Sequence, residues 1–176
     1  MKQIYLDTLA RIETEVTDIK YIDQDFGQID NIKEGGRAPV GLPCALLDFD
    51  DARFSDLGNK AQLADPATMK IRLVFPMWNP GNSLVKEQVR NYAVWMYDVE
   101  VAVNQALHGW RGSVFGPLMR TRRETEKRSD YKVIAIYYEF SYKDISCSPA
   151  YQRTPQGNKI GIDIGYLFNK KGDQEL

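Results

Sequence analysis

Histidine and cysteine are scarce in this chain of 176 residues, which holds one histidine, His108, and two cysteines, Cys44 and Cys147. Zinc sites built from several histidine or cysteine ligands are therefore nearly excluded, as is a cysteine–histidine nucleophilic pair. The two cysteines lie far apart and form no disulfide framework, so we expect reduced, buried thiols. His108 is expected to cap the end of a helix.

An excess of charge of one sign is also missing, because 23 basic side chains balance 24 acidic ones. No global field then attracts nucleic acid or an anionic membrane, and neither sequence-specific nucleic-acid binding nor membrane binding is expected. No segment approaches the roughly 20 apolar residues of a membrane span, and the first residues lack the apolar core of a signal peptide. A cytosolic protein is expected.

The glycines do not have the spacing of a phosphate-binding loop, so we expect the chain to bind no nucleotide and no other cofactor. What the chain has is an apolar fraction of 43%, enough for a real core. Its length predicts one domain, over residues 1–148. Residues 149–176 are predicted to be a linker and a strand that together act as an interaction arm.

Apolar residues at helical spacing predict an amphipathic helix within the first twenty residues. They are Tyr5, Leu9, Ile12, Val16 and Ile19, with Asp7, Arg11, Glu15 and Asp18 expected on the solvent side. Residues 21–43 then predict a long connection, and its length suggests an interaction arm.

Two strands with alternating apolar residues, 44–54 and 67–75, predict a hairpin. A second helix is expected to begin with Ser83 as its N-cap, to run as one long helix to Ala106 and to end before Gly109. Residues 120–128 predict a charged edge strand or ribbon, and an aromatic-rich strand with both faces partly covered follows a turn near residues 128–130. Near the end of the chain, Ile160, Ile162, Ile164, Tyr166 and Phe168 alternate with smaller or polar residues and predict a strand that adds to a sheet edge.

This order of elements predicts an α+β fold, a two-layer sandwich with two helices on one face of a mainly antiparallel sheet. The order is α-β-β-α-β-β, followed by the C-terminal strand.

The chain at this point resembles the small tail terminator and tail completion (head-tail joining) proteins of long-tailed bacteriophages and prophages. The resemblance rests on the segments IKYIDQDFGQIDN, APVGLPCALLDF, MKIRLVF, NYAVWMYDVEVAVNQALHG and RTRRETEKRSDYKVIAIYYEFSYKD, over residues 1–145. It implies a protein without catalytic activity that forms a ring, six-fold in symmetry, at the head-proximal end of the tail tube. The strand at 160–168 departs from the family pattern.

The partners that the resemblance implies are other copies of the chain, the tail tube protein and the head-connector protein, with DNA passing through the lumen of the ring. The expected location is the bacterial cytoplasm during assembly and then the tail or neck of the virion. The expected sites are therefore oligomer contacts, with no catalytic, cofactor or metal residue. They are Asp23, Asp25, Arg120, Arg122, Arg123, Ile162, Ile164 and Tyr166. Opposite charge further suggests that Arg122 and Arg123 pair with the acids at 48–56 of a neighbouring subunit.

Three alternative interpretations stay open at this point. A metal-dependent nuclease or phosphodiesterase would use Asp48, Asp50 and neighbouring acids, with Lys70 or Arg72 facing them. An adaptor would add strand 160–168 to the sheet of another protein. The ribbon at 120–128 would bind phosphate with tyrosines stacking beside it, although a solvated, charge-paired ribbon explains the same residues more simply.

Overall fold

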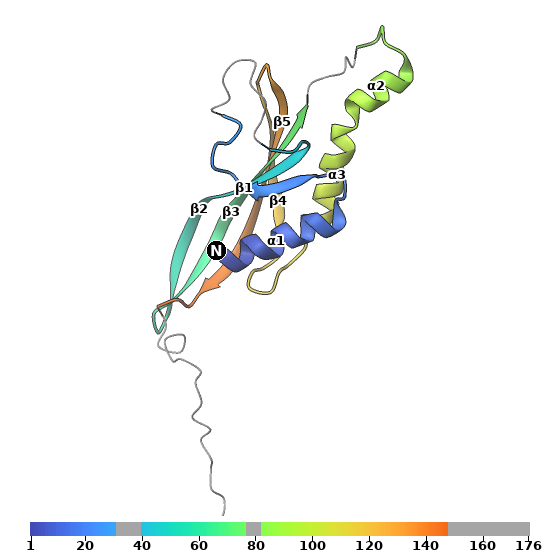
Figure 1. Cartoon of the computed structure of the whole chain (residues 1–176). Coiled ribbons are helices and arrows are strands. Elements are labelled where there is room, and N and C mark those ends of the chain that lie inside the picture. The colour runs from blue at the N-terminus through green and yellow to red at the C-terminus, as the bar shows by residue number, and fades with distance from the viewer. Residues whose placement is uncertain (31–39, 77–81, 148–176) are drawn as a thin grey trace, which may run out of the picture.

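A five-stranded sheet forms the centre of the computed structural model, which describes residues 1–30, 40–76 and 82–147 (Figure 1). The strand order is β1-β2-β3-β5-β4, and only the pair of β1 and β2 is parallel. The strands span Tyr21–Gln24, Cys44–Gly58, Ala61–Pro76, Met119–Glu126 and Tyr131–Asp144 for β1 to β5. The predicted α+β class and mainly antiparallel sheet are confirmed.

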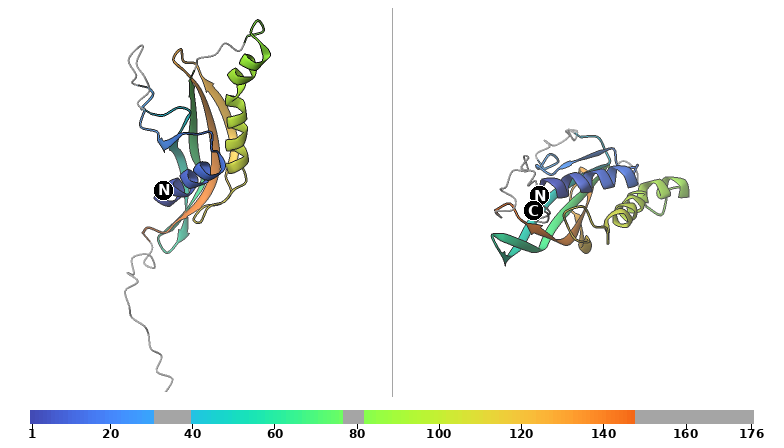
Figure 2. Two further views of the ribbon diagram at one scale, coloured as in Figure 1. Left: turned by 45° about the vertical axis from the view of Figure 1, so that its right-hand side comes forward. Right: turned by 90° about the horizontal axis from the view of Figure 1, so that it is seen from below.

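Helix α1 (Lys2–Glu15) and helix α3 (Met96–Leu107) bury side chains in one apolar cluster with the same face of the sheet. Figure 2 shows both helices on this side, with α2 (Glu87–Val94) continuing from α3 beyond the sheet. The buried residues of α1 are Ile4, Thr8 and Ile12, and the helix ends before Val16 and Ile19. The predicted helix was therefore too long, and Tyr5 and Leu9 are only half-buried.

The alternation predicted along the central strands is confirmed. Ala67, Met69, Ile71, Leu73 and Phe75 of β3 lie in the cluster beneath the helices, as do Ile134, Ile136, Tyr138 and Phe140 of β5. Val74 and Val133 point to the other face, where they join a smaller buried cluster with Ile29. Both faces of the central strands are covered because segment 25–30 lies over the face opposite the helices.

The hairpin of β2 and β3 is also confirmed and is longer than predicted. Its two-residue loop holds Asn59 and Lys60, both with positive φ, as a tight turn between twisted strands requires. Bulges interrupt β2 between Phe49 and Phe54. The predicted charged strand is β4, which lies at the edge of the sheet as expected.

Two helix predictions were wrong in detail. Helix α2 begins at Glu87 with Lys86 as its N-cap, so Ser83 does not cap it. The expected single helix is bent at Trp95, whose ring packs edge-on against Phe75 at 5.9 Å. The end of α3 is as predicted, because Gly109 follows the C-cap His108 with a φ of 78°.

Residues 21–30 do not form the loose connection that the sequence suggested. Tyr21–Gln24 pairs with Cys44–Leu47 as β1, and the backbone N–H of Asp25 continues this pairing by donating to Leu47. Residues 31–39 and the predicted strand at 160–168 lie outside the described residues.

Candidate functional site

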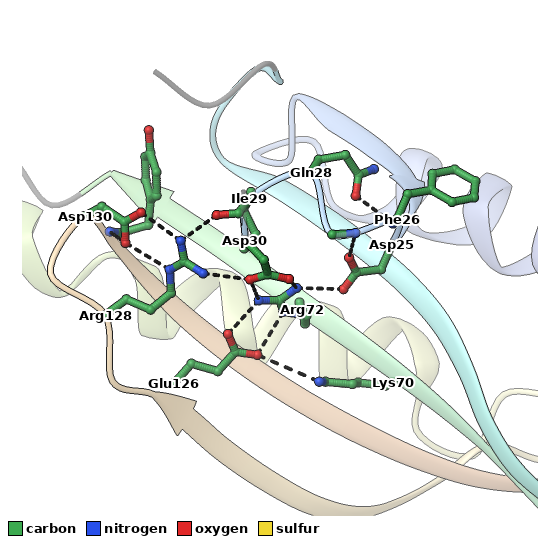
Figure 3. Close-up of polar contacts among 12 residues, drawn as sticks. Asp25, Phe26, Gln28, Ile29, Asp30, Lys70, Arg72, Glu126, Arg128 and Asp130 are labelled. Atoms are coloured by element: carbon green, nitrogen blue, oxygen red, sulfur yellow. Dashed lines mark hydrogen bonds and ion pairs between the residues drawn. The ribbon is translucent and has the colours of Figure 1, made fainter. Parts of the chain in front are cut away.

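Arg72 lies in the middle of β3, on the sheet face opposite the helices, with only 5% of its surface exposed. A charged side chain this deep in a fold must be paired, because desolvation strongly penalises a lone ion. All five N–H groups of its guanidinium have an acceptor (Figure 3). The arginine therefore forms the centre of the most extensive polar cluster in the described part of the chain.

Three carboxylates surround Arg72. Glu126 of β4 accepts from Nε and Nη2 at 2.8 and 2.7 Å, and Asp30 accepts from Nη1 and Nη2 at 2.9 and 2.8 Å. Asp25 accepts a further bond from Nη1 at 2.9 Å. Two bidentate pairs on one guanidinium use the planar fork of arginine, which lysine cannot reproduce.

Local turn structure places the two aspartates. The Asp25 carboxylate accepts from the Gly27 N–H at 3.0 Å, and the Asp30 N–H donates to the Gly27 carbonyl at 3.0 Å. Gly27 has a φ of 77°, a conformation that suits glycine. The turn brings both carboxylates over β3, so the ion pairs hold segment 25–30 onto the sheet.

Arg128 adds a second layer to this cluster, in the turn between β4 and β5. It donates to Asp30 at 2.7 Å, to Asp130 at 2.9 and 2.8 Å and to the Ile29 carbonyl at 2.5 Å. Lys70 lies 3.8 Å from Glu126 at the margin. The cluster thus joins four stretches of the chain, which are the 25–30 segment, β3, the end of β4 and the turn after it.

The electrostatics follow from this pairing. Burial alone would lower the pKa of Arg72, but its hydrogen bonds to Asp30, Glu126 and Asp25 raise it. The Arg72 hydrogen bond holds the pKa of Asp30 below its ordinary value, and Arg128 does the same for Asp130. Every donor on Arg72 is used and the acids are neutralised by arginine, so the cluster fastens a segment to the sheet and holds no activated nucleophile or base.

A second polar surface lies beside this cluster on the same sheet face. The guanidinium of Arg122 stacks over the Tyr137 ring at 4.2 Å, and the Tyr137 hydroxyl donates to Glu124. Arg122 also pairs with Glu124 at 2.9 Å yet remains 60% exposed. A shallow depression here is lined by Asp50, Asp51, Thr68, Thr121, Arg122, Tyr137 and Glu139.

The predicted contact residues do not form one site. Asp23 accepts a hydrogen bond from Tyr21 at 2.5 Å. The side chain of Asp25 is only 9% exposed and is paired with Arg72 of its own chain. Arg123 points to the helix side of β4, where it makes two hydrogen bonds of 3.0 Å to Glu100. Arg120 is exposed, and Ile162, Ile164 and Tyr166 lie outside the described residues. The role of all these predicted residues in oligomer contacts stays a prediction.

The acids proposed for a metal site do not converge. Across residues 1–30, 40–76 and 82–147, no group of three or more histidine, cysteine, aspartate or glutamate side chains is placed to hold a metal ion. Asp50 and Asp51 lie in the bulged part of β2, Lys70 approaches Glu126, and Arg72 faces Asp25 and Asp30. The arrangement that a two-metal nuclease needs is thus missing from the described residues.

The remaining sequence predictions concern His108 and the tyrosines of β5. His108 lies at the end of α3 as expected, and its Nδ1 accepts a hydrogen bond from the Arg120 N–H at 3.1 Å. Tyr138 is fully buried and cannot stack with a nucleic-acid base. None of the helices in the described residues is both long and apolar enough to cross a membrane.

Sequence analysis missed the Arg72 cluster, although one signal pointed to it. Arg72 interrupts an otherwise apolar run, IRLVF, and the apolar Val74 follows it on the same face of the strand. A charge at such a position implies a buried ionic partner. Nothing in the pattern identified Asp25, Asp30 and Glu126 as those partners.

Comparison with known proteins gives little similarity. No protein-family model matches the chain, and no curated protein matches it. Among solved structures, a chain described as "Virion of native gene transfer agent (GTA) particle" is similar at 12% identity and a TM-score of 0.37. The match covers 81% of this chain and 90% of that chain. Similarity this low supports neither a family nor a function.

Proposed function

We propose that the chain is a structural subunit of a phage or prophage particle, of the tail terminator or tail completion type, and that it acts by assembly. In this role, copies of the chain form a ring, six-fold in symmetry, at the head-proximal end of the tail tube. The ring stops growth of the tube and offers the head connector a docking surface. Its partners are other copies, the tail tube protein and the connector, and DNA passes through its lumen.

One observation carries this proposal: the fold has open sheet edges and a helix that extends beyond the sheet. In the described residues no strand pairs with the outer side of β4, where His108 accepts from the Arg120 N–H, and β1 covers β2 only at Cys44–Leu47. Helix α2 buries none of its residues. Open edges are strong sites for association.

Exposed apolar side chains on the projecting parts add to this argument. Tyr92 on α2 is 67% exposed, Leu84 before it is 94% exposed, and Phe54 in the β2–β3 hairpin is 50% exposed. These side chains lie on two separate parts of the molecule, α2 with the residues before it and the β2–β3 hairpin, so one chain offers two different surfaces to other copies (Figure 1). Contacts between different parts of identical subunits repeat head to tail and can close into a ring.

The charged edge suggests one such contact. Arg122 keeps 60% of its side chain exposed, and Asp50 and Asp51 are exposed in the bulged part of β2. Both arginines pair within their own chain, Arg122 with Glu124 and Arg123 with Glu100. The Arg123 side chain is only 37% exposed, so Arg122 is the better candidate to meet acids of a neighbouring subunit. Arg122→Glu should then weaken assembly more than Arg123→Glu does.

Multi-angle light scattering at several protein concentrations, with and without millimolar magnesium, tests the proposal. A ring, or a mass that rises with concentration and does not respond to magnesium, is the expected result. A strict monomer at all concentrations contradicts ring formation. If the behaviour of that monomer changes with magnesium, the metal-dependent nuclease interpretation becomes the next one to test, by nuclease assay and by the loss of metal binding in Asp50→Asn.

A further inference from the structure

The outer edge of β4 is an eight-residue row of backbone groups at the limit of the sheet. Residues Met119 to Arg123 are exposed, and within the described ranges no strand lies beyond them. The Arg120 N–H already donates to His108, so the part of the row offered to another strand lies beyond Arg120. An edge strand presents half of its N–H and C=O groups outward, where another strand can pair with them. The charges along β4 discourage unspecific pairing, so a partner strand must match them.

The two sides of this edge differ in character. On the helix side, Arg123 is paired with Glu100, and next to Glu100 on α3 lie Tyr97 and Val101, which are 44% and 54% exposed. These two side chains lie one turn apart on α3 and form an exposed apolar ledge, and Tyr97 is near enough to Arg123 of β4 to interact with it electrostatically. On the opposite side, Arg122 is exposed above the ring of Tyr137 and presents a positive charge.

We propose that the outer edge of β4 is the docking site for residues 160–168 of a second copy of this chain, which add to the sheet as a further strand. This inference rests on the proposed function, because it names the contact through which copies assemble. The segment has an alternating pattern suited to a strand, with Ile160, Ile162, Ile164, Tyr166 and Phe168 on one side.

The two sides of the segment match the two sides of the edge. Its apolar side covers Tyr97 and Val101 when it faces the helices. Its other side then carries Asp163, flanked by Gly161 and Gly165, toward the exposed Arg122. If the segment paired one residue out of register, Asp163 would lie under the apolar ledge. Because side chains alternate along a strand, the register decides which side of the segment faces the helices.

A second copy fits this edge better than the same chain does. Strand β5 ends at Asp144, and Glu139 near its end is paired with Met119 at the beginning of β4. A segment of the same chain that turned straight back from this end would run parallel to β4, and parallel pairing is slightly less stable per residue. A segment from another copy can approach antiparallel, and one donor and one acceptor on each copy give a repeating head-to-tail contact.

Disulfide cross-linking between two separately purified full-length variants tests the docking. Both carry Cys147→Ser to remove the exposed native thiol, whereas Cys44 is buried and stays. One variant has Asp163→Cys and the other Arg122→Cys, or Glu124→Cys two residues along on the same side. Opposite residues of paired strands lie about 4.5–5.5 Å apart at Cα, within reach of a disulfide. Arg123→Cys is the matched control because its side chain points to the other side of β4.

We expect a disulfide-linked dimer when Asp163→Cys is mixed with Arg122→Cys or Glu124→Cys, and no dimer with Arg123→Cys. The inference is overturned if neither same-side cysteine gives a dimer, or if Arg123→Cys gives as much. It is also overturned if a chain that carries both Arg122→Cys and Asp163→Cys forms only an internal disulfide, because the segment then docks on its own sheet.

The light-scattering result separates this inference from the proposed function. Rings without the cross-link would leave the function in place and remove β4 as the docking site. The cross-linked dimer without rings would keep the docking site and contradict the proposed ring. Circular dichroism of each variant confirms that the substitutions leave the fold intact.

Discussion

Arg72 and Glu126 are joined by two hydrogen bonds, from Nε to Oε1 at 2.8 Å and from Nη2 to Oε2 at 2.7 Å. They connect β3 with β4, although β5 lies between these strands in the sheet. The pair therefore spans a neighbouring strand and ties the polar edge to the centre. Asp25 and Asp30 complete the shell around the same guanidinium.

Arg72→Ala should strongly destabilise the fold, because it leaves three carboxylates close together without their cation. Removing one partner of a buried ionic cluster costs about 3–5 kcal/mol of unfolding free energy. Urea denaturation followed by circular dichroism measures this loss. Arg122→Ala on the exposed edge is the matched control and should change stability little. Equal losses in the two variants would show that the cluster is not a main source of stability.

Stability should fall at acid pH through Asp30 and Asp130. The folded state lowers the pKa of both groups through hydrogen bonds from Arg72 and Arg128, so the unfolded state binds protons first as the pH falls. Their contribution is complete above the unfolded pKa of about 3.9 and is lost as the pH falls through the folded values. Unfolding free energies measured between neutral and acid pH should decline less steeply for Asp30→Asn. An identical slope for that variant would contradict the role of Asp30.

The two thiols should differ sharply in reactivity. Burial, and to a lesser extent the charge of Asp25, raises the pKa of Cys44 to about 12. Cys147 is exposed, so the expectation of two buried thiols was wrong for this residue. Because the thiolate is the reactive form, a thiol-specific disulfide reagent at about pH 8 should modify Cys147 quickly and Cys44 only after unfolding. Cys147→Ser should abolish the fast phase. A fast phase that persists in this variant would mean that Cys44 is accessible in the folded chain.

Helix α2 should exchange its amide hydrogens faster than α3. No residue of α2 is buried, whereas Val99, Val103, Ala106 and Leu107 anchor α3 in the core. Local opening is easiest where buried apolar contacts are few. Hydrogen–deuterium exchange at low protein concentration measures the contrast, and a rise in concentration should slow α2 if neighbouring copies cover it. Equal protection of both helices in the dilute monomer would contradict the prediction.

The sequence predicted the helix-facing sides of the central strands well, because a period of two in β3 and β5 reports directly which side chains are buried. Ile71 and Ile134 lie where the alternation put them. The bend at Trp95 was not predictable in this way. Helical periodicity runs through it, and only the position of Phe75 on another element decides where Trp95 packs.

The ion-pair cluster was harder to predict for a similar reason. Asp25 was predicted to be an oligomer contact in a long connection and Asp30 had no predicted role, whereas their partner Arg72 looked like a residue on a polar strand face. Local pattern carries no information about which of 24 acids meets a given arginine. The short strand β1 was missed with them, because four residues are too few for alternation to stand out.

The arginine cluster also constrains the order in which the chain can complete its fold. Arg72 lies 47 positions from Asp25, 42 from Asp30 and 54 from Glu126, so the contacts close long loops on both sides of the arginine in the chain. Contacts between distant parts of a chain form late, since their loop-closure entropy must be paid first. We therefore expect the shell around Arg72 to close after the local β2–β3 hairpin has formed, and to be complete only when β4 brings Glu126 to the same guanidinium.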